Sequence, residues 1–137
     1  MPDIKLDILT PLGPKRDGID VAGVQVPGIA GELGVLPQHE SLVTAIVPGV
    51  VRFREGAKSI RLAVGAGFLE VKEAGRVIIL VERALEPEEI DLEAARTRMA
   101  EVEAELAKHR GAVTEPGHRD LAQEWAWLQA QVRCAAG

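Results

Sequence analysis

The sequence contains little cysteine and few aromatic residues. Its 137 residues include one cysteine, Cys134, which excludes a disulfide framework and a cysteine-rich metal site. Tyrosine is absent, and phenylalanine and tryptophan occur twice each, so no set of aromatic rings is available to stack on single-stranded nucleic acid. We interpret Cys134, which lies near the end of the chain, as an incidental thiol.

Long apolar runs and an excess of positive charge are also missing. The longest unbroken apolar stretch, residues 77–81, is far shorter than the roughly 20 residues that a membrane helix needs. The net charge of −5 argues against a general nucleic-acid binder and against adsorption onto anionic lipid. Residues 1–7 alternate between polar and apolar, unlike a targeting segment. We therefore expect a chain without direct membrane insertion, cytosolic or attached to a membrane through other proteins.

The usual catalytic patterns do not occur. The three histidines, His39, His109 and His118, have no metal-ligand spacing, although His109 and His118 could form a metal pair across a loop. The run 65–70 resembles the start of a dinucleotide-binding motif but lacks its third glycine and leads into a strand, so we read its glycines as hairpin or bulge positions. No catalytic residue, metal or cofactor is expected. Missing acid/base pairs and scarce aromatics also disfavour a stand-alone enzyme or a carbohydrate-binding module.

Residues 1–86 show a period of two, which predicts half-buried strands. Apolar and polar residues alternate in residues 4–8, 51–54 and 59–64. Turn signals at residues 48–49, 55–57 and 72–75 separate the strands. Many short strands with frequent glycine turns predict a β-sandwich or flattened barrel.

Residues 87–137 show a helical period and predict an antiparallel α-helical hairpin. Its two apolar seams are Leu92, Ala95, Met99, Val102 and Leu106, and Leu121, Trp125, Leu128 and Val132. A breaker-rich loop at 111–117 separates them, and either Pro87 or Asp91 begins the first helix. Trp127 lies off the seam, which predicts an exposed position or a contact outside the hairpin.

The predicted hairpin has a poor core of its own. Ordering each residue costs about 1–2 kcal/mol of backbone entropy, so two helices alone should be marginally stable. The stretch 77–81 is apolar on both faces and needs a cover on its outer side. We hypothesise that the hairpin, or another protein, supplies this cover.

Residues 26–42 have an unusual composition, with glycine at 28, 31 and 34 and proline at 27 and 37. These residues predict a fixed irregular path. Two interpretations stay open: a packed crossover loop between strands, or a rigid ledge that presents Glu32 and nearby apolar groups to a partner.

The chain resembles the ε subunit of the F-type proton-translocating ATP synthase. The resemblance rests on VPGIAGELGVLPQH at 26–39, LVTA at 42–45, PG at 48–49, GFLEV at 67–71 and ID at 90–91. It implies a β-sandwich of about ten strands at 1–86 and a regulatory helical hairpin at 87–137. It also implies a non-catalytic rotor subunit, peripheral on the cytoplasmic face of the cell membrane, that binds the γ subunit and the c-subunit ring. The hairpin would restrain ATP hydrolysis by extending into the α/β catalytic head.

The same resemblance implies site residues. The segment that faces the c ring and γ would comprise Gly31, Glu32, Leu33, Gly34, Val35 and His39, with Leu33 and Val35 packing and His39 shaping the loop. Basic residues of the first helix that could meet the head are Arg96, Arg98, Lys108 and Arg110. Ile90 and Asp91 begin the ATP-binding motif of some bacterial members, but Ala94 stands where that motif has arginine. We therefore expect weak or no nucleotide binding, and a nucleotide-sensing module is the alternative function.

Overall fold

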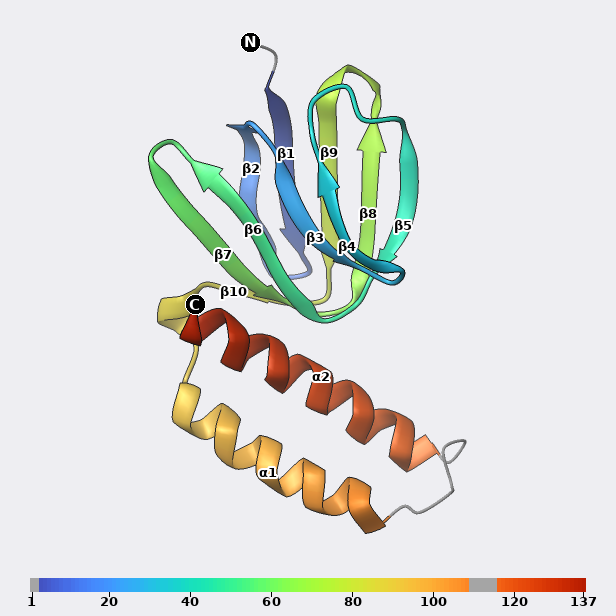
Figure 1. The fold of residues 1–137 in the computed structure, drawn as a ribbon, viewed down its shortest axis with the longest axis vertical. Helices are drawn as coiled ribbons and strands as arrows, with labels where there is room; N and C mark the ends of the chain where they lie inside the picture. The colour runs from blue at the N-terminus through green and yellow to red at the C-terminus, as the bar shows by residue number, and fades with distance from the viewer. Residues whose placement is uncertain (1–2, 109–115) are drawn as a thin grey trace.

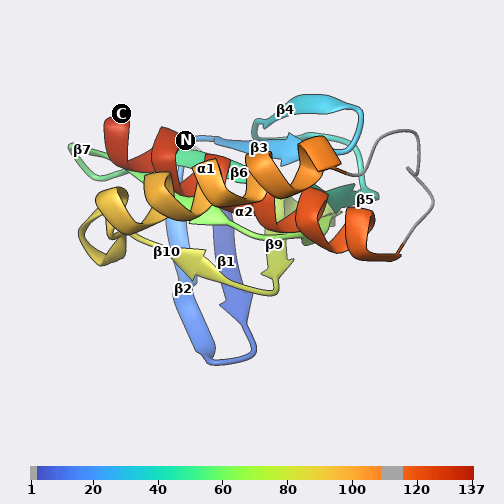
Figure 2. The same ribbon diagram turned by 90° about the horizontal axis from the view of Figure 1, so that it is seen from below.

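The computed structural model describes residues 3–108 and 116–137, and it divides them into a β-sandwich and a helical hairpin (Figures 1 and 2). This confirms the predicted fold class. The strands are β1 (Ile4–Thr10), β2 (Gly13–Val21), β3 (Val24–Gly28), β4 (Gly31–Val35), β5 (Leu42–Ile46), β6 (Gly49–Glu55), β7 (Lys58–Val64), β8 (Gly67–Lys72), β9 (Arg76–Val81) and β10 (Ala84–Leu85). The helices are α1 (Leu92–Lys108) and α2 (Pro116–Ala136), which lie across one end of the sandwich.

The strands form one hydrogen-bonded path that folds over on itself. Its order is β10-β7-β6-β3-β5-β8-β9-β1-β2, with β4 paired to β3. The layers meet at a corner where β3 and β5 share the single pair Gly28–Ile46. At the far side, Arg16 of the edge strand β2 binds Glu55 of β6 (Nε–Oε2, 3.1 Å), which ties the two layers together.

The inward-facing residues of both layers form one apolar core. Ile4, Leu6 and Ile8 are fully buried, as their alternation predicted, and they pack with residues such as Leu62 and Ile79. Fully burying such a side chain contributes about 1.5–3 kcal/mol, so this core is the main stabilising element of the sandwich.

Asp7 departs from the alternation because it is buried. Its carboxylate accepts a hydrogen bond from the Gly18 amide (2.6 Å) and pairs with Arg76 (Oδ2–Nη2, 2.6 Å). The register of β1 and β2 shifts on either side of Ile8, which brings Gly18 over Asp7. Both partners compensate the cost of removing the carboxylate from water.

The predicted turns occur where the sequence placed them. Gly56 and Ala57 join β6 to β7, a short 3-10 helix at Glu73–Gly75 joins β8 to β9, and Pro48 separates β5 from β6. Gly56 has φ = 63°, a conformation that favours glycine.

The seams of the two helices meet as predicted. Every predicted seam residue except Leu92 belongs to one cluster between α1 and α2. Both proposed starts are used: Pro87 begins a short 3-10 helix at Pro87–Glu89, and Asp91 caps α1 by accepting from the Ala94 amide (3.0 Å). Pro116 and Gly117 belong to α2 rather than to the predicted loop, because proline is tolerated in a first helical turn.

Candidate interaction surfaces

The segment at 24–35 is a regular β-hairpin, so the irregular path predicted for 26–42 is found only at 36–41. Strands β3 and β4 pair in register from Val24–Val35 to Gly28–Gly31, and Ile29 and Ala30 form the tip. Gly31 has φ = 122°, and a Cβ on Gly28 would lie 2.9 Å from the Gly31 carbonyl oxygen. The glycines thus permit a tight turn between two extended strands, and the path is regular because both strands satisfy their backbone groups.

The predicted c-ring and γ contact residues of β4 alternate between its exposed face and its inward face. Glu32 and Gly34 are exposed, and Leu33 is half-buried against the core. Val35 is fully buried, so its predicted role as a contact is corrected to that of a core residue. Side chains alternate along a strand, and Val35 therefore points inward beside an exposed Gly34.

His39 stabilises the loop that follows β4. Its amide donates to the Leu36 carbonyl (3.2 Å), and its ring Nδ1 lies 2.8 Å from the Glu40 carbonyl oxygen. These bonds hold a turn in which Gln38 has φ = 69°. Residues that the sequence reasoning missed are Ile29 and Leu36, two large apolar side chains that flank Glu32 in sequence and are about two-thirds exposed.

A second apolar surface covers the outer side of β5, β8 and β9. Val43, Phe68 and Leu80 are 69%, 59% and 47% exposed. Phe68 lies in register with Ala45 on one side and Leu80 on the other, so these side chains share a face. We call Val43, Ala45, Phe68 and Leu80 the β8 face.

The described helices α1 and α2 do not pack chiefly on the β8 face. Helix α2 packs on β6 and β7 instead, which corrects the part of the cover hypothesis that assigned residues 77–81 to the hairpin. The physical reason is that β6 and β7 offer Val50 and Ala63 as outward apolar residues in one register pair.

Three residues of α2 make this contact. Trp127, Ala130 and Cys134 are buried against Val50 and Ala63. Cys134 is fully buried, so it is a packing residue rather than an incidental thiol, and burial raises the pKa of its thiol. Trp127 makes the contact outside the hairpin that its off-seam position allowed.

Two arginines of the sandwich reinforce the contact. The guanidinium of Arg83 lies 4.6 Å from the ring centroid of Trp127. The Arg61 Nε donates to the Cys134 carbonyl near the C-terminal end of α2, where helix carbonyls lack partners in the helix and carry partial negative charge.

The basic residues of α1 occupy different environments. Arg98 forms a two-pronged pair with Glu124 of α2 (Nε–Oε2 2.7 Å, Nη2–Oε1 2.9 Å), and this pair lowers the pKa of Glu124. Arg96 and Lys108 are exposed, and Arg110 lies outside the described residues, as does His109. In this conformation Arg98 therefore binds within the hairpin.

The two residues of the predicted nucleotide motif have structural roles. Ile90 is half-buried against the contact between α2 and the sandwich, and Asp91 caps α1. Among residues 3–108 and 116–137, no three His, Cys, Asp or Glu side chains come together as a metal site. In the same part of the chain, no helix is long and apolar enough to cross a membrane.

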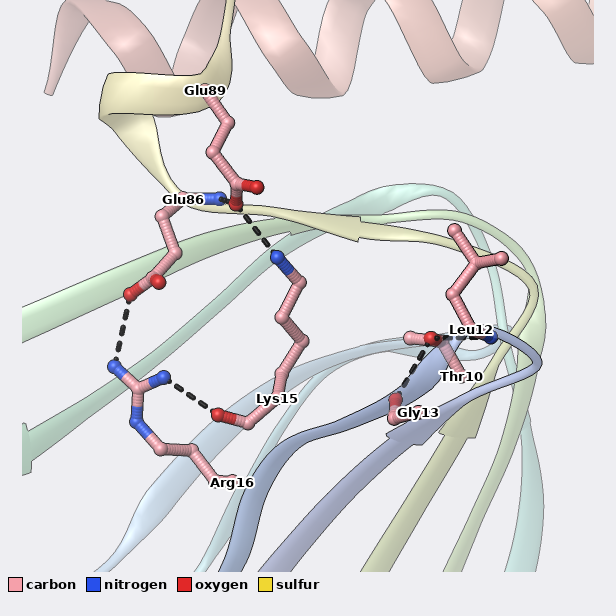
Figure 3. Close-up of polar contacts among 7 residues, drawn as sticks. All are labelled: Thr10, Leu12, Gly13, Lys15, Arg16, Glu86 and Glu89. Carbon is pink, nitrogen blue, oxygen red and sulfur yellow. Dashed lines mark hydrogen bonds and ion pairs between the residues drawn. The ribbon is translucent and has the colours of Figure 1, made fainter.

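Ion pairs fix the linker between sandwich and hairpin (Figure 3). Arg16 of β2 binds Glu86 (Nη2–Oε1, 3.0 Å), and Lys15 binds Glu89 (Nζ–Oε1, 2.7 Å). Glu89 also accepts from the Glu86 amide (2.8 Å), and this bond and then Lys15 lower the pKa of Glu89. We call Lys15, Arg16, Glu86 and Glu89 the linker clamp.

Comparison with known proteins identifies the family. The family model described as "ATP synthase, Delta/Epsilon chain, beta-sandwich domain" matches residues 3–87. The ATP synthase epsilon chain of Desulforamulus reducens is 40% identical over 103 residues, which cover 74% of this chain and 76% of the relative. The chain belongs to the ATP synthase epsilon chain family. It is an epsilon subunit of the F-type ATP synthase central stalk and a non-catalytic part of that enzyme.

The similarity extends through the hairpin. ATP synthase epsilon chain 2 of Syntrophotalea carbinolica is 34% identical over 134 residues, covering 98% of this chain and 96% of the relative. A chain in the cryo-EM structure of Euglena gracilis mitochondrial ATP synthase (OSCP/F1/c-ring, rotational state 1) matches with a TM-score of 0.84 at 25% identity, covering 100% of this chain and 83% of that one. A chain of the Tetrahymena thermophila central stalk/c-ring structure shares the fold, with a TM-score of 0.58 at 14% identity.

Proposed function

We propose that this epsilon chain links the c ring to the γ subunit, and that the β3–β4 hairpin is its c-ring contact. The observation that carries the proposal is the exposed tip, where Glu32 has no ion-pair partner among the described residues and Ile29 is exposed. A carboxylate beside an apolar residue suits a partner loop with both basic and apolar groups.

The β8 face supports γ as the second partner. Exposed apolar residues that adjoin one another, rather than being scattered singly, mark protein interaction surfaces. The β3–β4 tip adjoins the β8 face at one end of the sandwich (Figure 1), where the Ile29 amide donates to the Ala45 carbonyl (3.1 Å), so one rigid body can hold two subunits in a fixed relation. The chain then transmits rotation without any reaction of its own.

Replacing Glu32 by arginine tests the c-ring contact. We expect docking of the chain on ATP synthase stripped of its epsilon subunit to weaken about tenfold, the range of a lost and reversed charge pair. Proton-driven ATP synthesis by the reconstituted enzyme should fall with it. Glu73→Arg is the matched control, because Glu73 is also exposed but belongs to the β8–β9 turn. Equal docking and synthesis in Glu32→Arg and wild type would contradict the contact.

The hairpin supports a further, regulatory role. Its main contact with the sandwich comes from α2, whereas α1 packs chiefly on α2. A hairpin attached along one helix can leave without unfolding the sandwich, which is the kind of two-state element that a switch requires. After release, Arg96 and Lys108 would be the first basic residues to meet the α/β head, as a restraint on ATP hydrolysis.

The linker clamp sets the pivot of this movement. Glu86 and Glu89 are bound to β2, so the chain up to Glu89 moves with the sandwich. Rotation then occurs at Ile90 and Asp91, between the clamp and α1. Ile90 packs at the contact between α2 and the sandwich and must change partners when the hairpin leaves, whereas Asp91 can keep its cap on α1.

Replacing Arg16 by glutamine should loosen this pivot. The Arg16 side chain is 14% exposed, and it bonds to both Glu55 and Glu86. We expect the amides of Glu89 and Ile90, which now donate to Glu86 and Pro87, to exchange hydrogen about tenfold faster. Lys5→Gln, which breaks the exposed pair with Asp20, is the control. Unchanged exchange in Arg16→Gln would show that the 3-10 turn alone holds the linker.

The clamp also predicts a pH dependence with a definite sign. The pKa of Glu89 is lowered in the folded chain from its ordinary 4.5. The stabilisation that Glu89 contributes to the folded chain is therefore complete above pH 4.5, the ordinary pKa. It is lost as the pH falls through the lowered pKa of the folded chain.

A further inference from the structure

The surface on which α2 rests continues past the end of that helix. On β6, Val50 lies two residues before Arg52, and on β7, Ala63 lies two residues after Arg61; helix α2 covers Val50 and Ala63, which are register partners, as are the two arginines. Because side chains two apart share a face, Arg52 and Arg61 lie on the same outer surface as the covered pair. The outer surface is thus apolar under α2 and basic beyond it.

Register extends the basic part across four strands. Arg52 pairs with Arg61 of β7 on one side and with Gln25 of β3 on the other, and Gln25 pairs with Gly34 of β4. Arg54 lies two residues further along β6 and faces the same way. We call Arg52, Arg54 and Arg61, with Gln25 and Gly34, the arginine face.

A groove runs through the arginine face. Its volume is about 490 Å³, and the three arginines border it together with apolar groups of Leu36, Phe53 and Ile60. A Cβ at Gly34 would have no heavy atom within 4 Å, so this glycine leaves part of the groove open.

The three arginines have no carboxylate partner among the residues that the structure describes. Arg54 donates to the Ser59 hydroxyl and the Ala57 carbonyl, and Arg61 donates to the Cys134 carbonyl. The other sandwich arginines differ, since Arg16, Arg76 and Arg83 each pair with a glutamate or aspartate. The chain as a whole is acidic, with a net charge of −5, so a cluster of arginines without carboxylate partners is a local exception to its overall charge.

We propose that the arginine face binds an acidic segment of a neighbouring stalk subunit, with carboxylates on Arg52 and Arg54 and an apolar side chain in the groove. Guanidinium groups bind carboxylates in a two-pronged geometry, and the apolar wall shields such a pair from water. Gln25 and Arg52, at the centre of the face, are each paired with a strand on both sides, so their backbone amides lie within the sheet and form no amide cradle of the kind that favours a phosphate group. The proposal rests on the proposed function, because the partner is sought within the central stalk.

The end of α2 already uses this surface. Its C-terminal carbonyls carry partial negative charge, and Arg61 binds one of them. When the hairpin leaves, Arg61 loses this partner and becomes available to the acidic segment beside Arg52. Binding at the arginine face and packing of the hairpin therefore share one residue.

The test measures docking of the full chain on ATP synthase stripped of its epsilon subunit, at low and at moderate salt. We expect R52Q/R54Q to raise the Kd about tenfold at low salt and to reduce its dependence on salt. The control K5Q/K58Q removes the same amount of charge from exposed positions off this face. Both variants should unfold at the wild-type temperature, because all four side chains are exposed.

The outcomes separate the hypotheses. If wild type fails to dock, the proposed function itself is wrong. If wild type docks and R52Q/R54Q docks equally well, the arginine face is not the contact. Titration with inorganic pyrophosphate is a further test. If wild type binds pyrophosphate saturably and R52Q/R54Q does not, while both dock equally well, the face binds a small anion and the acidic-segment proposal is wrong.

Discussion

Replacing Trp127 by alanine is expected to free the hairpin and to expose Cys134 to a thiol reagent about 100 times faster than in wild type. Trp127 is 6% exposed and is the largest side chain between α2 and the sandwich. Removing a buried tryptophan costs about 3–5 kcal/mol, and each 1.4 kcal/mol changes an equilibrium about tenfold. The stacked guanidinium of Arg83 loses its partner in the same step.

Cys134 makes this release measurable by thiol labelling without an engineered cysteine. It is the chain's one cysteine and is fully buried beside Ala63. Burial limits its reactivity twice, by excluding the reagent and by raising the thiol pKa, which lowers the thiolate fraction. Both restrictions end when α2 leaves the sandwich, so the labelling rate reports the open population.

Trp125→Ala is the matched control. Trp125 belongs to the seam between the helices, and its Nε1 donates to Glu103 of α1 (3.0 Å). Its removal weakens the hairpin internally but leaves the contact of Trp127 with β6 and β7. Faster labelling in Trp125→Ala than in Trp127→Ala would show that α1 and α2 separate before α2 leaves the sandwich. If Trp127→Ala folds and its Cys134 is labelled at the wild-type rate, Trp127 does not anchor α2 on the sandwich.

The periodic parts of the fold were predictable because burial follows backbone geometry. The alternation in β1 and the apolar seams of α1 and α2 each mark one buried face of a single element. A local sequence pattern can encode such a face because it depends only on the backbone period. The second face of α2 also left a signal, since Trp127, Ala130 and Cys134 follow helical steps of three and four. This stripe is a weak signal because alanine and cysteine are small and the last residues of a chain are expected to fray.

The surfaces were harder to predict because they depend on register between distant strands. The sequence and the resemblance indicated Glu32, which is exposed, but they also included Val35, which faces the core. The β8 face requires the pairing of Ala45, Phe68 and Leu80, and the arginine face requires that of Gln25, Arg52 and Arg61. No local pattern specifies which strands become neighbours. The linker clamp likewise joins residues about 70 positions apart.

Gly67→Ala is expected to destabilise the sandwich by about 3 kcal/mol, at the upper end of the range for overpacking. Gly67 begins β8 opposite Val81, and a Cβ built on it would lie 1.9 Å from the Leu80 carbonyl oxygen and 2.7 Å from the Val81 Cα. Both atoms belong to the backbone of β9, so no side-chain rotation relieves the clash. The β8–β9 ladder would have to open, in the layer that also presents the β8 face.

Gly34→Ala provides the control, because a Cβ there meets no heavy atom within 4 Å and its φ lies outside the range that favours glycine. Urea unfolding of the two variants measures the difference directly, and equal midpoints would contradict the close approach of β8 and β9. If Gly67→Ala is destabilised, the glycine in the run 65–70, which begins like a dinucleotide-binding motif, has a structural role. The second glycine of this run, Gly67, lies where two strands approach too closely for any side chain. The close backbone contact therefore explains this glycine, and no phosphate site is needed to explain it.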